Sequence, residues 1–156
     1  LGKLAVPSEL LDKPGKLTPR EKSVIRCHTF FTRRALENIS SFEAITAWSS
    51  DHHERLDGSG YPFHLGGRDL SLGARIVAVS DVFTAITEDR PYRAGMDTAK
   101  AQKVINIMAA RSALDPDVVR LFMNNYEELN SVRISAQSEA VKEYGDICGR
   151  VAALAG

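Results

Sequence analysis

The sequence has few cysteines, no long hydrophobic run and no excess of charge of either sign. Its 2 cysteines, Cys27 and Cys148, lie far apart, which excludes a disulfide framework and a CxxC metal or redox motif. Charged or polar residues interrupt every apolar stretch well before the roughly 18 residues that a membrane helix needs. We therefore expect a soluble, cytoplasmic protein with reduced cysteines.

The balance of charge narrows the class of ligand. The 156 residues include 20 basic and 20 acidic side chains, for a formal net charge of +0 at pH 7. A neutral protein does not attract nucleic acid or an anionic membrane surface as a whole. We expect neither a nucleic-acid polymer nor a membrane as a partner of this chain, and local charge must hold any anion that it binds.

The hydrophobic pattern predicts an all-α fold. Thr18-Pro19-Arg20-Glu21 is a helix-capping sequence, which Ser40-Ser41-Phe42-Glu43 repeats, and apolar residues from 72 to 87 recur at helical intervals. Residues 58–72 contain four glycines and no regular period, which is typical of a functional loop. The expected helices are residues 18–38, 40–58 and 72–87, one capped by Asp97, one opened by Asp115-Pro116, and a terminal helix or extension over residues 131–156.

The densest group of reactive side chains is the run from His52 to Pro62, which reads HHERLDGSGYP. Adjacent histidines on a helix point in different directions, but at a helix end they can serve neighbouring metal ions. Asp57 follows His53 by four residues, and we expect its carboxylate to accept a hydrogen bond from an imidazole or from loop amides. Asp81 is an acid on an otherwise apolar helix, and nitrogen with carboxylate ligands suits first-row metal ions.

This run resembles the HHExxDGxGYP signature of the HD-GYP family, which comprises cyclic di-GMP phosphodiesterases of the HD metal-hydrolase superfamily. The resemblance covers about residues 1 to 125. Its further matches are Gly2-Lys3-Leu4, the Lys13-Pro14-Gly15-Lys16-Leu17 turn, His28, the helix from Ala74 to Phe83 and Arg90-Pro91-Tyr92-Arg93.

The resemblance implies an HD-type helical bundle with a long glycine-rich loop that holds two or three divalent ions, iron or manganese. The ligands that it implies are His28, His52, His53 and Asp81, with Glu54 and Asp57 supporting them. The positions that match nucleotide contacts are Gly60, Tyr61, Pro62, Arg90 and Arg93. Lys3 matches a lysine that can protonate the leaving oxygen, and guanidinium groups bind phosphate oxygens in a fork.

One part of the family pattern lies outside the chain. The His-Asp pair of the family stands directly before the position of Leu1, so the chain is either a fragment of a longer protein that carries the pair or a naturally truncated relative. A longer protein leaves room for a regulatory or sensory domain upstream. We expect residues 1–130 to form the HD-GYP-like domain and residues 131–156 a helical extension. For the 156-residue chain alone we expect weak metal occupancy and little activity.

Simpler interpretations stay open for several residues. Asp81 could pair with Arg75 in a structural ion pair, and Arg90 and Arg93 could stabilise the C-terminus of a helix. Lys3 could simply be solvated.

Two functions follow from the resemblance. The first is metal-dependent hydrolysis of cyclic di-GMP in bacterial second-messenger signalling. The alternative is an inactive nucleotide-binding or protein-interaction module, favoured if the His-Asp pair is missing, with signalling partners bound through the loop. A generic HD-type hydrolase fits the complete loop less well, and the sequence leaves a homodimer open.

Overall fold

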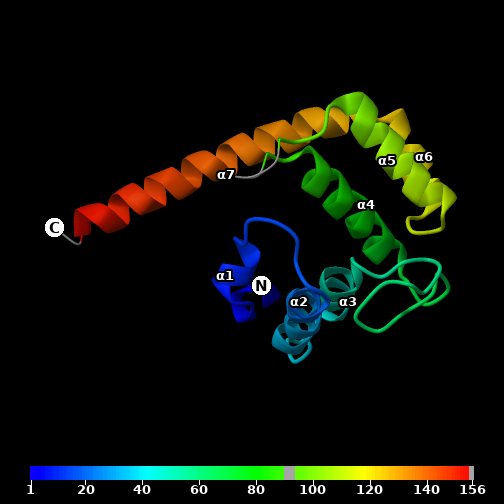
Figure 1. Ribbon diagram of the computed structural model, residues 1–156, viewed down its shortest axis with the longest axis horizontal. Coiled ribbons are helices and arrows are strands. Elements are labelled where there is room, and N and C mark those ends of the chain that lie inside the picture. Colours follow the sequence, from blue (N-terminus) through cyan, green and yellow to red (C-terminus); the bar gives the residue numbers. More distant parts are fainter. Residues whose placement is uncertain (90–93, 155–156) are drawn as a thin grey trace. The chain divides into compact units, whose positions relative to one another are not determined.

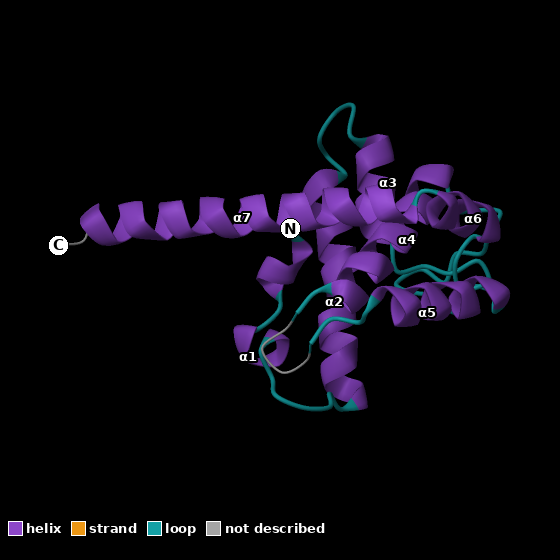
Figure 2. Cartoon of the chain, turned by 90° about the horizontal axis from the view of Figure 1, so that it is seen from above, coloured by secondary structure: helices purple, strands orange, loops and turns teal. Residues whose placement is uncertain are grey.

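The computed structural model describes residues 1–89 and 94–154, and all regular structure in these residues is helical (Figures 1 and 2). The expected all-α fold is confirmed. Apart from one isolated bridge between Asp57 and Gly66, the described chain has no strand pairing. The elements in chain order are η1 (Gly2–Ala5), α1 (Ser8–Leu11), α2 (Pro19–Leu36), α3 (Glu43–Asp51), α4 (Leu72–Thr87), α5 (Thr98–Ala110), α6 (Pro116–Asn124) and α7 (Tyr126–Leu154).

Several helices begin where their capping residues predict. Helix α2 starts with a complete capping box, in which the Thr18 hydroxyl accepts a bond from the Glu21 amide and the Glu21 carboxylate accepts one from the Thr18 amide. The Asp97 side chain accepts a bond from the Lys100 amide at the start of α5. Helix α4 has the bounds expected from its apolar stripe.

Helix α3 differs from its prediction at both ends. It begins at Glu43 after the N-cap Phe42, whose side chain has no atom that can accept a capping hydrogen bond. The expected capping box is therefore not formed, and Ser41 adopts a positive φ of 70°. It ends at Asp51 rather than near Gly58. The prediction of a helix through residue 58 was therefore wrong, and His53 lies in a turn.

The structure divides into two units, Leu1–Val119 and Arg120–Gly156. In the first unit α2 packs against η1 and α3, α3 against α4, and α4 against α5. The buried apolar side chains of α4 and α5 are Ala74, Ala78, Val79, Phe83, Ala101 and Ile105. This packing brings the middle of α2 and the C-terminal end of α3 to the same cavity as the middle of α4.

The second unit is dominated by α7, a single uninterrupted helix (Figure 1). In this unit the ring of Phe122, on α6, meets the ring of Tyr126, on α7, edge to face, with 5.7 Å between the centroids. The expected end of the HD-GYP-like domain at residue 130 stays a prediction. Among the described residues, no helix is both long and apolar enough to span a lipid bilayer.

Candidate metal centre

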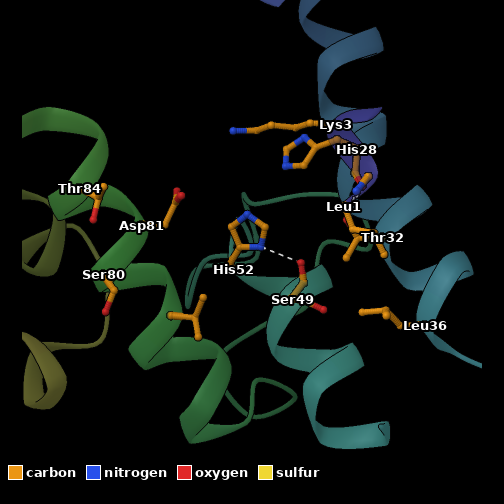
Figure 3. Close-up of a pocket in the computed structure, with 12 residues that line it drawn as sticks. Leu1, Lys3, His28, Thr32, Leu36, Ser49, His52, Ser80, Asp81 and Thr84 are labelled. Carbon is orange, nitrogen blue, oxygen red and sulfur yellow. Dashed lines mark hydrogen bonds between the residues drawn. The ribbon is translucent and has the colours of Figure 1, made fainter. Parts of the chain in front are cut away.

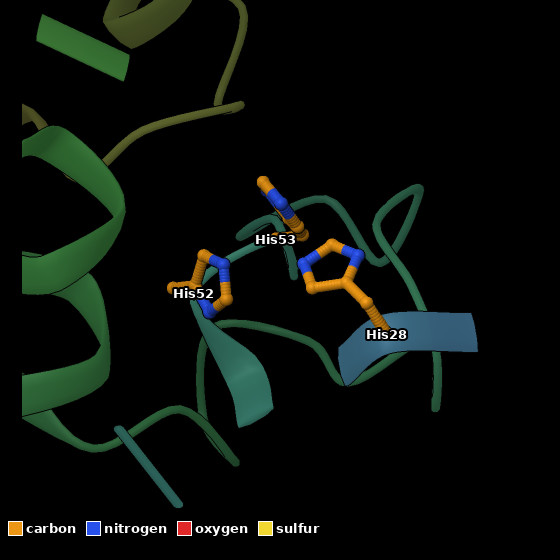
Figure 4. Close-up of side chains that lie close together, drawn as sticks. All are labelled: His28, His52 and His53. Atoms are coloured by element: carbon orange, nitrogen blue, oxygen red, sulfur yellow. The ribbon is translucent and has the colours of Figure 1, made fainter. Parts of the chain in front are cut away.

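Three histidines from two neighbouring elements converge in the first unit (Figure 4). His28 is on α2, His52 is the C-terminal cap of α3, and His53 follows in the turn. Each offers one ligating atom, and these atoms all lie within 4.8 Å of one another. The early end of α3 allows this arrangement, because a continued helix would point the two adjacent rings in different directions.

Backbone carbonyls hold two of the rings in a defined orientation. Nδ1 of His28 lies 2.7 Å from the carbonyl oxygen of Ile25, and Nδ1 of His52 lies 2.9 Å from that of Ser49. A carbonyl oxygen can only accept, so both Nδ1 atoms carry the proton and both Nε2 atoms present a lone pair. Orienting contacts of this kind are usual for ligating histidines.

The centre contains a buried ring nitrogen that no protein group satisfies. Nε2 of His28 is buried and has no hydrogen-bond partner among the described residues. Leaving a buried acceptor unpaired costs about 1–3 kcal/mol, so a site that keeps one is suited to a ligand. A divalent metal ion fits this cluster, because imidazole nitrogens are common ligands of first-row divalent ions.

Burial also keeps the imidazoles neutral. It is the largest cause that lowers the pKa of His28, His52 and His53 below the ordinary histidine value. For His53, burial and the two neighbouring imidazoles bring the pKa to about 3. In the metal-free chain all three rings therefore have lone pairs available near neutral pH, which is the form that binds metal.

Asp81 approaches the histidines from α4. Its Oδ2 lies 3.7 Å from Nδ1 of His53, and its side chain is 38% exposed. Arg75 does not pair with it: the Arg75 guanidinium lies 2.9 Å from the carboxylate of Asp115 and also donates to the carbonyl oxygen of Leu70. The carboxylate of Asp81 is thus left facing the histidines instead of a structural cation.

A cavity of about 730 Å³ opens beside the cluster (Figure 3). His28, His52 and Asp81 line it, and the exposed side chain of Lys3 points into it from η1. Gly2 permits this position, because a Cβ there would lie 1.8 Å from the carbonyl oxygen of His28. The close approach of η1 to α2 therefore places an ammonium group next to the histidines.

A second cavity, of about 220 Å³, is also lined by His52. Gly60 and Tyr61 line it, and the Tyr61 ring centroid is 4.9 Å from that of His53. Burial raises the pKa of Tyr61 to about 12, so its hydroxyl stays protonated. Pro62 follows through a cis peptide bond, whereas Arg90 and Arg93 lie outside the described residues.

Glu54 and Gly60 hold the loop in place. Glu54 is 3% exposed, and its carboxylate accepts hydrogen bonds from the amides of Phe63 at 2.6 Å and Leu65 at 3.1 Å. Gly60 is buried so tightly that a Cβ would lie 2.4 Å from the Cα of Glu54. Glu54 thus supports the wall beside the histidines through the loop backbone.

Asp57 is exposed, and its carboxylate accepts a bond from the amide of Ser59 at 2.9 Å. We expected the Asp57 carboxylate to accept a hydrogen bond either from an imidazole or from loop amides, and the bond present comes from a loop amide.

Sequence reasoning missed two arginines. Arg26 and Arg55 line the second cavity, and the Arg26 guanidinium carbon lies 4.9 Å from the centroid of the Tyr61 ring. Arg26 precedes His28 by two residues and Arg55 directly follows Glu54. Their closeness in sequence to His28 and Glu54 was the only signal that could have selected them. No spacing pattern distinguishes an arginine that contacts a ligand from an ordinary surface arginine.

A family model described as an HD domain matches residues 1–118. The chain belongs to the HD domain family. The HHERLDGSGYP run and the similarity to cyclic dinucleotide phosphodiesterases confirm the expected HD-GYP type. HD-domain phosphohydrolases bind divalent metal ions, which agrees with the histidine cluster.

Curated relatives of this HD domain are similar over most of its length. A cyclic di-GMP phosphodiesterase of Pseudomonas aeruginosa is 44% identical over 79% of the chain. A 3'3'-cGAMP-specific phosphodiesterase of Vibrio cholerae is 36% identical over 86%, and a cyclic di-GMP phosphodiesterase of Thermotoga maritima is 33% identical over 93%. The chain spans only 30%, 31% and 40% of these three relatives, respectively.

Proposed function

We propose that the protein hydrolyses a phosphodiester bond of cyclic di-GMP at the histidine centre. The observation that carries this proposal is the convergence of three imidazoles within 4.8 Å around a buried, unpartnered Nε2, in a chain of the HD domain family. The proposed substrate is that of relatives known as cyclic di-GMP phosphodiesterases, such as those of P. aeruginosa and T. maritima.

The ligands in this proposal are His28, His52, His53 and Asp81, which hold two or three divalent ions, iron or manganese. Imidazole together with carboxylate suits both metals. When bound, such ions lower the pKa of water and so supply a nucleophile near neutral pH. The carbonyl oxygens of Ile25 and Ser49 keep the ring nitrogens directed at the site, while Glu54 and Asp57 support it through the loop.

Other residues handle the substrate. The Lys3 ammonium points into the larger cavity and there protonates the departing oxygen. Gly60, Tyr61 and Pro62 form a wall for the nucleotide, and Arg90 and Arg93 neutralise phosphate charge.

The test is hydrolysis of cyclic di-GMP by the intact gene product that carries this chain. After loading with Fe²⁺ or Mn²⁺, we expect linear dinucleotide or GMP by chromatography, and loss of turnover after chelation or in His53→Ala. The exposed loop histidine provides the control His64→Asn, which should retain activity. Undiminished turnover in His53→Ala would remove the assignment. Faster turnover of 3'3'-cGAMP than of cyclic di-GMP would reassign the substrate.

A further inference from the structure

The smaller cavity beside the histidine centre joins an apolar surface to two cationic side chains. Arg26 and Arg55 line it together with His52, His53 and Tyr61. Its apolar lining residues are Val82, Met108, Ala113 and Leu114. The histidines belong to both this cavity and the metal centre, so a ligand bound here lies directly beside the reacting site.

The Tyr61 ring holds the Arg26 guanidinium in position. The guanidinium carbon lies 4.9 Å from the ring centroid of Tyr61, and that ring is itself 4.9 Å from the ring of His53. The attraction is between the positive charge and the π-electrons of the ring, so it uses no hydrogen-bond acceptor. Among the described residues, the Arg26 guanidinium N–H groups donate to no acceptor, and they therefore remain available to a ligand.

Arg26 lacks the anionic partner that two other arginines of α2 have. Arg33 on the same helix lies 3.5 Å from the carboxylate of Asp51, and Arg34 pairs with Glu37. Among the described residues no carboxylate pairs with Arg26, which lies on the same helix as the buried His28. An unpaired guanidinium at a cavity beside a metal centre is suited to an anion.

We propose that Arg26 binds a phosphate group of the cyclic dinucleotide and positions it beside the histidine centre. The inference rests on the proposed function, because that function supplies the substrate. The guanidinium fork matches two non-bridging phosphate oxygens, and the cation–π contact with Tyr61 restrains the guanidinium before the substrate arrives. Arg55 adds a second positive charge at the same cavity, while the apolar lining accommodates a base.

The test compares Arg26→Ala and Arg26→Lys with Arg20→Ala in the intact gene product. Arg20 is an exposed arginine in the first turn of the same helix, α2, and it lines neither cavity beside the histidines. The Kd for cyclic di-GMP is measured by calorimetry on metal-free protein, where no turnover occurs. We expect Arg26→Ala to raise Kd about tenfold to a hundredfold, the range for a lost bond to a charged group.

Arg26→Lys should recover part of the affinity, because it keeps the charge but loses the fork. Arg20→Ala should bind like the wild type. An unchanged Kd in Arg26→Ala overturns the inference, as does an equal loss in Arg20→Ala. If Arg26 only supports Tyr61, Arg26→Ala lowers the melting temperature and leaves Kd unchanged, which also overturns it.

The two proposals fail in different ways. A wild type that binds cyclic di-GMP but does not cleave it after metal loading disproves the proposed function, while the Kd ratio still decides the role of Arg26. A wild type that does not bind cyclic di-GMP without metal but cleaves it after metal loading overturns only the role of Arg26. A wild type that neither binds nor cleaves it overturns both.

Discussion

The histidine centre and the loop that follows it treat their polar groups in opposite ways. In the loop, the carboxylates of Glu54 and Asp57 are bonded to nearby amides. In the centre, Nδ1 of His28 contacts a carbonyl oxygen, and the buried Nε2 has no partner in the part of the chain that the structure describes. Polar groups that the protein satisfies itself build a scaffold, whereas a buried group left open marks a place for a ligand. We therefore expect substitutions in the histidine centre to reduce metal affinity and substitutions in the loop to reduce the stability of the fold.

The largest effect should come from the centre. We expect His28→Ala to weaken the affinity of the intact gene product for Mn²⁺ by more than about a hundredfold. Removing a residue that only orients a metal ligand already weakens metal affinity by up to about a hundredfold, and His28 is itself a proposed ligand. Titration calorimetry measures the affinity. His64→Asn is the control, since it removes an exposed imidazole in the loop and keeps a side chain tolerant of the positive φ of 56°. Equal affinities in His28→Ala and the wild type would erase the contrast between centre and loop.

The next effect concerns the loop scaffold. Glu54→Gln should lower the free energy of unfolding by about 1–3 kcal/mol, because a carboxylate that accepts two partly buried hydrogen bonds becomes an amide that can accept only through one oxygen. Denaturant titration measures the loss. The exposed Glu43→Gln is the matched control, with an expected change of no more than about 0.5 kcal/mol. A similar stability of the two variants would mean that Glu54 does not hold the loop.

Gly60 offers a steric test of the same scaffold. Gly60→Ala should destabilise the protein by about 1–3 kcal/mol, since its Cβ would meet backbone atoms of Glu54 and Arg55 that cannot move aside freely. Gly66→Ala in the same loop is the control, because the nearest atom to its Cβ lies at an ordinary 3.9 Å. If thermal unfolding showed both variants equally stable, the tight packing at Gly60 would be refuted.

The smallest effect belongs to Asp57. Its hydrogen bonds with Ser59 lower the pKa of the carboxyl from its usual 3.8. A carboxyl whose pKa is lowered in the folded state adds stability at pH values above its ordinary pKa. This contribution disappears as the pH falls through the folded-state pKa. Asp57→Asn should therefore unfold slightly more easily than wild type at neutral pH, with a difference that closes in acid. A difference that grows in acid would reverse this sign.

Local patterns predicted the elements that local contacts determine. The apolar stripe of α4 and the capping residues of α2 and α5 gave the correct helices, because their signals lie within a few residues. The end of α3 was wrong for a different reason. Glu54 bonds to amides nine and eleven residues further on, and these contacts draw the chain into the loop after Asp51. No helical period reports such contacts.

The candidate site was predictable to a similar extent. The adjacent histidines were visible in the motif, whereas His28 was selected only through the family resemblance, because a single histidine on a helix has no pattern of its own. Its proximity to His52 and His53 depends on the packing of α2 against α3. Arg26 was missed because its place over Tyr61 follows from the fold of the loop.

The most direct test of the metal centre is anomalous diffraction from crystals of the intact gene product loaded with Mn²⁺. The account predicts an anomalous peak within bonding distance of ring nitrogens from His28, His52 and His53, with Nδ1 of His28 still bonded to the carbonyl oxygen of Ile25. A peak elsewhere, with these three rings free of metal, would contradict it.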